Sequence, residues 1–328
     1  ALRSTMNPRS TPASRASLAV AVFGAGAVGC FFGARLAESG VPVTLIARPE
    51  HVDAIAANGL RFESAGGSRQ IPMRATRDVE AGVAGAGLVL FCVKTPDTEV
   101  AARLLAPLLA PDCALVSLQN GVDNAGRIRD AAGIDALAAV VYVAASMPGP
   151  GHLLHAGRGD LILGEYGPAL SGRPRAAGRD RRIAALFESA GVPCPVSVDV
   201  RVELWEKLVV NCAFNAISAL TRQRYGRMVA DAGIRDLMRQ IIDECVAVAA
   251  ADGVALADAE RQFDAALQIG EAMARATSST AQDMARGRKT EIDSLNGHVA
   301  RRGAALGVPT PANQALHALI RLAESAPG

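Results

Sequence analysis

A glycine-rich turn near the start of the chain limits what this sequence can fold into. The segment Gly24-Ala25-Gly26-Ala27-Val28-Gly29 follows an apolar run, Leu18–Phe23, and opens a helical pattern over Gly26–Ser39. Such glycines also occur for packing alone, but between a strand and a helix they are typical of a dinucleotide-binding loop. The first glycine permits the tight turn, the second lets the backbone approach a pyrophosphate, and the third lets helix and strand pack closely. The helix N-terminus adds partial positive charge, so we expect these six residues to bind a dinucleotide.

Strand and helix patterns alternate after this loop as far as about residue 197. Helical periodicity near 97–110 and 123–132 separates apolar runs that predict strands at Val41–Ala47, Leu88–Val93, Ala114–Ser117 and Leu137–Val143. This alternation is typical of an α/β fold with a Rossmann-type, doubly wound parallel sheet. Two later runs, His152–Ala156 and Asp160–Gly164, flank a Gly-Arg-Gly sequence and predict a hairpin. One more helix is predicted at Arg175–Ser189.

Helical periodicity alone is found from about Val200 onward. The predicted helices are Val200–Arg222, Asp231–Asp252, Asp258–Ala276, a segment near Thr280–Arg286, Glu291–Leu306 and Thr310–Ala323. We therefore predict a tail at 1–17, a dinucleotide-binding Rossmann domain at 18–197 and an all-α substrate and catalytic domain at 198–328. A chain of 328 residues is long enough for two such cores.

Charge and residue spacing argue against several classes of function. The net charge is only +2, so nothing favours a nucleic acid or an anionic membrane as a partner. The six cysteines and five histidines show no metal-ligand spacing, and no metal is expected. The uncharged stretch Leu18–Ala34 has the outline of a secretion signal, but its four glycines suit a nucleotide loop better. We expect a cytoplasmic protein in which residues 1–17 are a mobile tail or an added remnant.

The end of the second predicted strand bears on the type of cofactor. Enzymes that use NAD usually place Asp or Glu there to bind the ribose 2′-hydroxyl, whereas an arginine accommodates the 2′-phosphate of NADP. Here the strand ends in Leu45-Ile46-Ala47-Arg48. We expect Arg48 to pair with a 2′-phosphate and the cofactor to be NADP(H). In the alternative, Arg48 is a solvated cation and Glu50 binds the ribose of NAD.

Lysine is rare in this chain, and Lys207 lies beside two asparagines in an otherwise apolar segment. Only three of the 34 basic residues are lysine: Lys94, Lys207 and Lys289. Lysine can give up a proton, whereas arginine stays protonated in proteins. Lys207, Asn211 and Asn215 are spaced i, i+4 and i+8, so they share one stripe of an otherwise apolar helix. Buried polar groups need partners, which are either other helices or a polar substrate between the domains.

The sequence resembles the ketopantoate reductase (2-dehydropantoate 2-reductase) family from about Leu18 to the C-terminal helix. Six motifs in order carry the resemblance: the Gly24–Gly29 loop, Val93-Lys94-Thr95, Gln119-Asn120-Gly121, Trp205-x-Lys207-Leu208-x-x-Asn211-x-x-x-Asn215, Ser278-Ser279-x-x-Gln282-Asp283, and Thr290-Glu291-Ile292-Asp293 with Asn296-Gly297. The resemblance implies a reduction of a 2-keto acid, 2-dehydropantoate, to a 2-hydroxy acid, with NADPH as the reductant.

The resemblance also implies roles for single residues. Lys207 matches the family's catalytic lysine, and Glu291 matches the acid that works beside it. The residues that match substrate-binding positions are Asn211, Asn215 and Ser279. Lys94 matches a residue of the cofactor cleft, and Asn120 matches a position that borders both cofactor and substrate. Charge builds on a ketone oxygen as hydride reaches the carbon, and a positioned ammonium can stabilise and then protonate that oxygen. Carboxamides and a hydroxyl can bind the carboxylate and hydroxyl groups of the substrate.

Each of these residues also has a structural alternative. Glu291 could pair with Lys289 or Arg288 near a helix start. Asn120 could be a turn residue, Ser279 part of a helix cap, and Lys94 the solvated end of a strand. Tyr225 occupies a place where relatives often have a small polar residue, and its phenol could narrow the pocket.

Other functions stay open beside 2-dehydropantoate reduction. The scaffold could reduce a different 2-keto acid, or act as an opine-type dehydrogenase that joins a keto acid to an amine. A non-catalytic NADP(H)-binding sensor would bind cofactor without turnover, but it would not need Lys207 and Glu291 together with the polar substrate-binding set. The helical domain could pair with a second copy, and no feature of the sequence specifies the oligomeric state.

Overall fold

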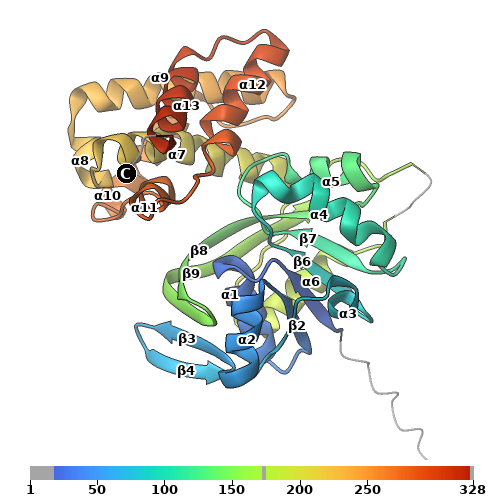
Figure 1. Cartoon of the computed structure of the whole chain (residues 1–328). Helices are drawn as coiled ribbons and strands as arrows, with labels where there is room; N and C mark the ends of the chain where they lie inside the picture. Colours follow the sequence, from blue (N-terminus) through green and yellow to red (C-terminus); the bar gives the residue numbers. More distant parts are fainter. Residues whose placement is uncertain (1–17, 172–174, 326–328) are drawn as a thin grey trace, which may run out of the picture.

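One nine-stranded sheet occupies the N-terminal half of the described chain, and helices alone follow it (Figure 1). The computed structural model describes residues 18–171 and 175–325. The tail predicted at 1–17 therefore lies outside the described residues. No helix within the described ranges is long and apolar enough to cross a membrane.

Six neighbouring parallel strands run from one edge of the sheet, at β5, to β8. Their order is β5-β2-β1-β6-β7-β8, with bounds Arg74–Thr76, Val43–Ile46, Val20–Phe23, Leu88–Phe91, Ala114–Ser117 and Leu137–Gly149. This order reverses direction between β1 and β6, and ligands of doubly wound sheets bind outside the carboxyl ends of the strands at such a point. The predicted Rossmann-type fold is confirmed, and its cofactor crevice is expected beyond Phe23 and Phe91.

Helices cover both faces of the sheet, as the near-continuous apolar strands require. One face packs against α1 (Ala27–Glu38), α2 (Pro49–Asn58) and α6 (Arg179–Ser189). The other packs against α3 (Val79–Val83), α4 (Thr98–Leu105) and α5 (Asn124–Ala132). The buried core on this second face continues into the helical part of the chain. The structure thus joins the two parts through one apolar core.

The predicted hairpin around Gly157-Arg158-Gly159 is wrong. The segment is one continuous strand, β9 (His152–Glu165), antiparallel to β8, and the hairpin turn lies instead at residues 150–151. The pairing with β8 shifts register at this point: Tyr142 pairs with Asp160 and Val143 pairs with Arg158, so Gly159 is skipped. The glycines thus make a β-bulge that bends the strand rather than a turn that ends it. Beyond β9 the sheet ends in a pair that sequence reasoning missed, β3 (Leu60–Ser64) and β4 (Gly67–Ile71).

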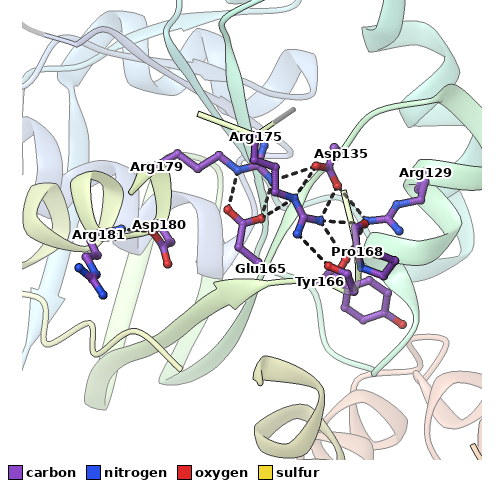
Figure 2. A network of polar contacts seen from close by, with 10 residues as sticks. Arg129, Asp135, Glu165, Tyr166, Pro168, Arg175, Arg179, Asp180 and Arg181 are labelled. Atoms are coloured by element: carbon purple, nitrogen blue, oxygen red, sulfur yellow. Dashed lines mark hydrogen bonds and ion pairs between the residues drawn. The ribbon is translucent and has the colours of Figure 1, made fainter. Parts of the chain in front are cut away.

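A network of arginines and acids holds the chain after β9 against the start of β8 (Figure 2). Asp135 accepts hydrogen bonds from Arg129 (2.8 Å) and Arg175 (2.6 and 2.8 Å), and Glu165 accepts from Arg179 (2.7 and 2.6 Å). Burial raises the pKa of Asp135, but the surrounding arginines outweigh it and lower the pKa. The helix predicted from Arg175 begins only at Arg179, because Gly178 before it has a left-handed backbone, with a φ of +65°.

Seven helices make up the part of the described chain from Val200 onward. They are α7 (Val200–Thr221), α8 (Tyr225–Ala230), α9 (Ala232–Ala251), α10 (Ala259–Ala272), α11 (Ser279–Ala285), α12 (Asn296–Leu306) and α13 (Pro311–Glu324). Most match the predicted helices within two residues, and α8 was missed. The helix predicted at Glu291–Leu306 is broken at Leu295, whose φ of −107° and ψ of −111° separate a 3-10 turn from α12.

The link between sheet and helices is short. Val196 still bridges to Leu163 of β9, and α7 begins at Val200. The boundary that we predict between residues 197 and 198 falls in this link and stays a prediction. The α7 helix lies against β8 and β9, with Trp205 and Phe214 fully buried, and so crosses from one part to the other.

Candidate active site

The three loop glycines have geometries that fit the roles assigned to them. Gly24 has a φ of +100°, and a Cβ there would lie 2.7 Å from the backbone of Cys92 and Val93, so β1 and β6 approach too closely for any side chain. A Cβ at Gly29 would lie 2.6 Å from the carbonyl oxygen of Gly24, so α1 packs directly on the loop. A Cβ at Gly26 would meet nothing within 4 Å, which leaves open space at the N-terminus of α1. This space suits a pyrophosphate, which supports the predicted binding role of the loop.

Arg48 lies at the end of β2, where sequence reasoning expected it. It precedes α2, and its side chain is 79% exposed with Nε 3.4 Å from Oε1 of Glu50. Both groups that the alternatives assign to the ribose are therefore neighbours. A 2′-phosphate would compete with Glu50 for the guanidinium, whereas a 2′-hydroxyl would turn to the carboxylate.

Lys207 projects from α7 onto the carboxyl side of the sheet. Its ammonium donates to Oδ1 of Asn120 at 3.0 Å and to the carbonyl oxygen of Val141 in β8 at 2.5 Å. Burial lowers the pKa of Lys207 from 10.5 to about 8, although the carboxylate of Glu291 acts in the opposite direction. An ammonium has three donors, so one N–H remains for a further acceptor. A buried lysine with a pKa near 8 can give up that proton near neutral pH.

Asn120 connects Lys207 to Glu291. Its Nδ2 donates to Oε2 of Glu291 at 2.9 Å, while its backbone oxygen accepts from Asn124 at 2.7 Å. Oε1 of Glu291 lies 4.0 Å from Nζ of Lys94, whose side chain is 65% exposed. Glu291 thus turns to Asn120 and Lys94 instead of Lys289 or Arg288, and Asn120 does more than form a turn. Residues 94, 120, 207 and 291 come together from four separate segments.

The remaining predicted residues extend along α7. Asn211 lines the same pocket as Lys207. Asn215, one turn further and 3% exposed, has Nδ2 3.5 Å from Oγ of Ser279. Ser278, not Ser279, caps α11, because its Oγ accepts from the backbone N–H of Ala281 at 3.0 Å. The Ser279 hydroxyl is therefore not needed by the helix end.

A pocket lies between the sheet and α7, beside the ammonium of Lys207. Residues from three segments line it: Gln119, Asn120, Gly121, Ala139, Val140, Val141, Leu204, Lys207, Leu208 and Asn211. Among the lining residues that were not predicted as site residues, two make polar contacts: Val141 with Lys207, and Gln119 with neighbouring loops. The carbonyl of Val141 has no signal in the sequence, because any residue supplies one. Gln119 stood in a quoted motif, and its amide joins the loops by donating to Val93 O (3.1 Å) and Thr98 Oγ1 (2.8 Å).

Tyr225 lies away from this pocket. It is 9% exposed, and its ring centre lies 4.4 Å from that of Phe214 in the helical core. Burial raises the pKa of its phenol to about 12. Tyr225 is not among the residues that line the pocket at Lys207, so this part of the structure gives it a packing role.

Comparisons with known proteins agree over most of the chain. The family described as "Ketopantoate reductase PanE/ApbA" matches residues 20–168, and "Ketopantoate reductase PanE/ApbA C terminal" matches residues 199–324. A 2-dehydropantoate 2-reductase of Mesorhizobium japonicum is 33% identical, over 92% of this chain and 96% of that protein. One of Halobacterium salinarum is 32% identical, over 93% of this chain and 98% of that protein.

Solved structures show the same similarity. A PanE/ApbA family ketopantoate reductase from Ralstonia eutropha JMP134 is 49% identical with a TM-score of 0.85, and the match covers 94% of this chain and 98% of that chain. A ternary structure of D-mandelate dehydrogenase with NADH and anilino(oxo)acetate has a TM-score of 0.83 at 23% identity, over 94% of this chain and 98% of that one. At that identity the second match shows a shared fold alone.

Proposed function

Because this chain belongs to the ketopantoate reductase family and is therefore an oxidoreductase, we propose that it reduces 2-dehydropantoate to pantoate with NADPH, with Lys207 as the general acid. The observation that carries this proposal is the ammonium of Lys207. It is buried against two acceptors, keeps one N–H unused and has a pKa near 8. Such a group can stabilise a developing alkoxide and then protonate it.

The surrounding side chains fix where the proton is donated. Asn120 and the Val141 carbonyl accept hydrogen bonds from two of the three N–H groups of Lys207. These two contacts fix the direction in which the third N–H points. Glu291 acts through Asn120 as a nearby negative charge that favours the ammonium form. Asn211, Asn215 and Ser279 supply neutral donors and acceptors for the hydroxyl and carboxylate groups of the substrate.

The cofactor residues support NADPH. The loop at Gly24–Gly29 and the N-terminus of α1 would hold the pyrophosphate, Arg48 the 2′-phosphate, and Lys94 and Asn120 would border the cleft. When bound, reduced nicotinamide supplies the hydride for the keto carbon. The protein's own part is to orient the ketone oxygen toward Lys207 and to deliver the proton.

Absorbance assays with a panel of keto acids, with and without amino acids, test the reaction and its rivals. We expect turnover with 2-dehydropantoate, faster with NADPH than with NADH. Faster turnover of another keto acid would redirect the substrate assignment, a requirement for an amine would indicate an opine-type enzyme, and cofactor binding without turnover would indicate a sensor.

A substitution of Lys207 tests the role of the ammonium. Lys207→Arg keeps the charge but not the acidity or the compact geometry, and we expect kcat to fall by about 10²- to 10⁴-fold. NADPH affinity, measured by fluorescence titration, serves as the control and is expected to stay near the wild-type value. A variant that retains wild-type kcat contradicts the mechanism.

A further inference from the structure

A second cation lies over the same aromatic ring as Lys207. The ring belongs to Tyr142 of β8, the residue after the Val141 carbonyl that binds the ammonium. Cζ of Arg158 lies 4.0 Å from the centre of this ring, and Nζ of Lys207 lies 5.4 Å from it. Both cations therefore border the same stretch of β8, and the charge of Arg158 is near enough to act on the amine of Lys207. Neither the resemblance nor the predicted site used Arg158.

The backbone at Arg158 has an unusual left-handed conformation. Arg158 has a φ of +53°, and Arg222 is the one other non-glycine residue of the described ranges with a positive φ. Arg222 follows the end of α7, where a left-handed residue is ordinary, whereas Arg158 lies inside a strand. At the next residue, Gly159, a Cβ would lie 2.5 Å from Cζ of Phe31. A left-handed arginine inside a strand is costly, and such residues cluster at binding sites.

Asp160 holds one edge of the guanidinium and leaves the other edge available. Nε of Arg158 donates to Oδ1 of Asp160 at 3.0 Å, and Nη2 donates to Oδ2 at 2.6 Å. A guanidinium has five N–H donors in a planar fork, so the edge made by Nη1 and Nη2 remains. Within the described parts of the chain no hydrogen bond occupies that edge, and the side chain is 57% exposed. Asp160 thus orients a fork that can still take a second planar anion.

The groups that the proposed function assigns to the substrate include no cation besides Lys207. Lys207 already donates to Asn120 and Val141, and its third N–H is needed by the ketone oxygen. The other groups assigned to the substrate on α7 and α11 are neutral, and Lys94, 4.0 Å from Glu291, is assigned to the cofactor cleft. An anion that leaves water for a partly buried pocket needs a paired charge.

We propose that Arg158 binds the carboxylate of the 2-keto acid through its Nη1–Nη2 edge, with Asp160 as its positioning residue. The carboxylate of such a substrate is bonded to the keto carbon, so it must lie close to the ammonium that takes the ketone oxygen. Arg158 is the cation that shares the Tyr142 ring with that ammonium, and a guanidinium fork matches a carboxylate in two parallel hydrogen bonds. This inference deepens the proposed function and rests on it.

Arg158→Asn is the variant of choice, because asparagine tolerates a left-handed backbone and removes the charge. Arg61→Asn is a matched control: Arg61 also donates to an acid two residues later, Glu63, at 2.9 Å, but it lies on β3, opposite His152 at the start of β9 (Figure 1). Three readouts are compared, namely kcat and KM for 2-dehydropantoate, the same constants for its methyl ester, and calorimetric binding of oxamate to NADPH-loaded enzyme.

For Arg158→Asn we expect KM for the acid and Kd for oxamate to rise by about 10- to 100-fold, with kcat and the ester constants near wild type. Arg158→Lys is expected to recover part of the loss, and Arg61→Asn to change nothing. An unchanged KM and Kd, or an equal loss for acid and ester, overturns the role of Arg158. Absence of turnover in the wild-type enzyme would instead refute the proposed function, and oxamate binding would still decide for or against Arg158.

Discussion

The pH dependence of keto-acid reduction gives a quantitative test of the state of Lys207. Burial lowers the pKa of this amine from 10.5 to about 8. A general acid works only while protonated, so kcat/KM for reduction is expected to be level below about pH 7 and to fall about tenfold per pH unit above the pKa. Oxidation of the 2-hydroxy acid requires the neutral amine and is expected to rise over the same range.

The energetic size of this effect follows from the same pKa. Each pH unit between the folded and unfolded pKa corresponds to about 1.36 kcal/mol, so the buried ammonium costs the folded state about 3 kcal/mol below pH 8. Between about pH 8 and 10.5 the unfolded chain binds the proton that the folded chain has lost, so this residue's contribution to stability rises with pH. Urea unfolding of the wild type relative to Lys207→Met, measured from pH 7 to 10, reports the pKa without turnover.

Charges near Lys207 predict how variants shift the alkaline limb of the pH profile, which is the fall in kcat/KM above the pKa of Lys207. The carboxylate of Glu291 raises the pKa of Lys207, against the larger effect of burial, whereas the guanidinium of Arg158 lowers it in the same direction as burial. We expect Glu291→Gln to move the limb to lower pH and Arg158→Asn to move it to higher pH. Lys207→Arg is the control, since arginine stays protonated and loses the limb with most of the rate. A wild-type rate that is unchanged from pH 7 to 9.5, or a limb that persists in Lys207→Arg, refutes the reasoning.

Two further predictions concern the cofactor. Arg48→Ala is expected to raise KM for NADPH by about 10- to 100-fold while KM for NADH stays the same, because only the 2′-phosphate loses a charged partner; equal effects on both would remove Arg48 from the site. Gly29→Ala is expected to lower the free energy of unfolding by about 1–3 kcal/mol, because its Cβ would lie 2.6 Å from the carbonyl oxygen of Gly24. The Cβ of Gly26→Ala would meet no atom within 4 Å, so this variant is expected to keep its stability. Thermal unfolding is expected to leave Gly26→Ala near wild type while calorimetry shows about tenfold weaker NADPH binding; normal binding would exclude the open space at Gly26 as the phosphate site.

Elements with a strong local pattern were predicted well from the sequence. The strands at 20–23 and 114–117 and the long helix α7 follow from apolar periodicity, which depends on neighbours a few residues apart. The strands β3 and β4 were missed, because β4 is mostly polar and exposed and is held by pairing with β3. The segment at 157–159 was misread as a turn, since glycine marks both turns and bulges.

The sequence by itself determined the Rossmann-type sheet, the glycine loop and the polar stripe on α7, because each rests on spacing within one segment. Only the tertiary structure decided what surrounds Lys207. Its partners lie 87 and 66 residues away along the chain, and one of them is a backbone carbonyl that no residue type reveals. Burial, which lowers the pKa of this amine, likewise arises only when β8 and α7 pack together. Desolvation and long-range contact depend on the whole fold, and the chemistry of this site depends on them.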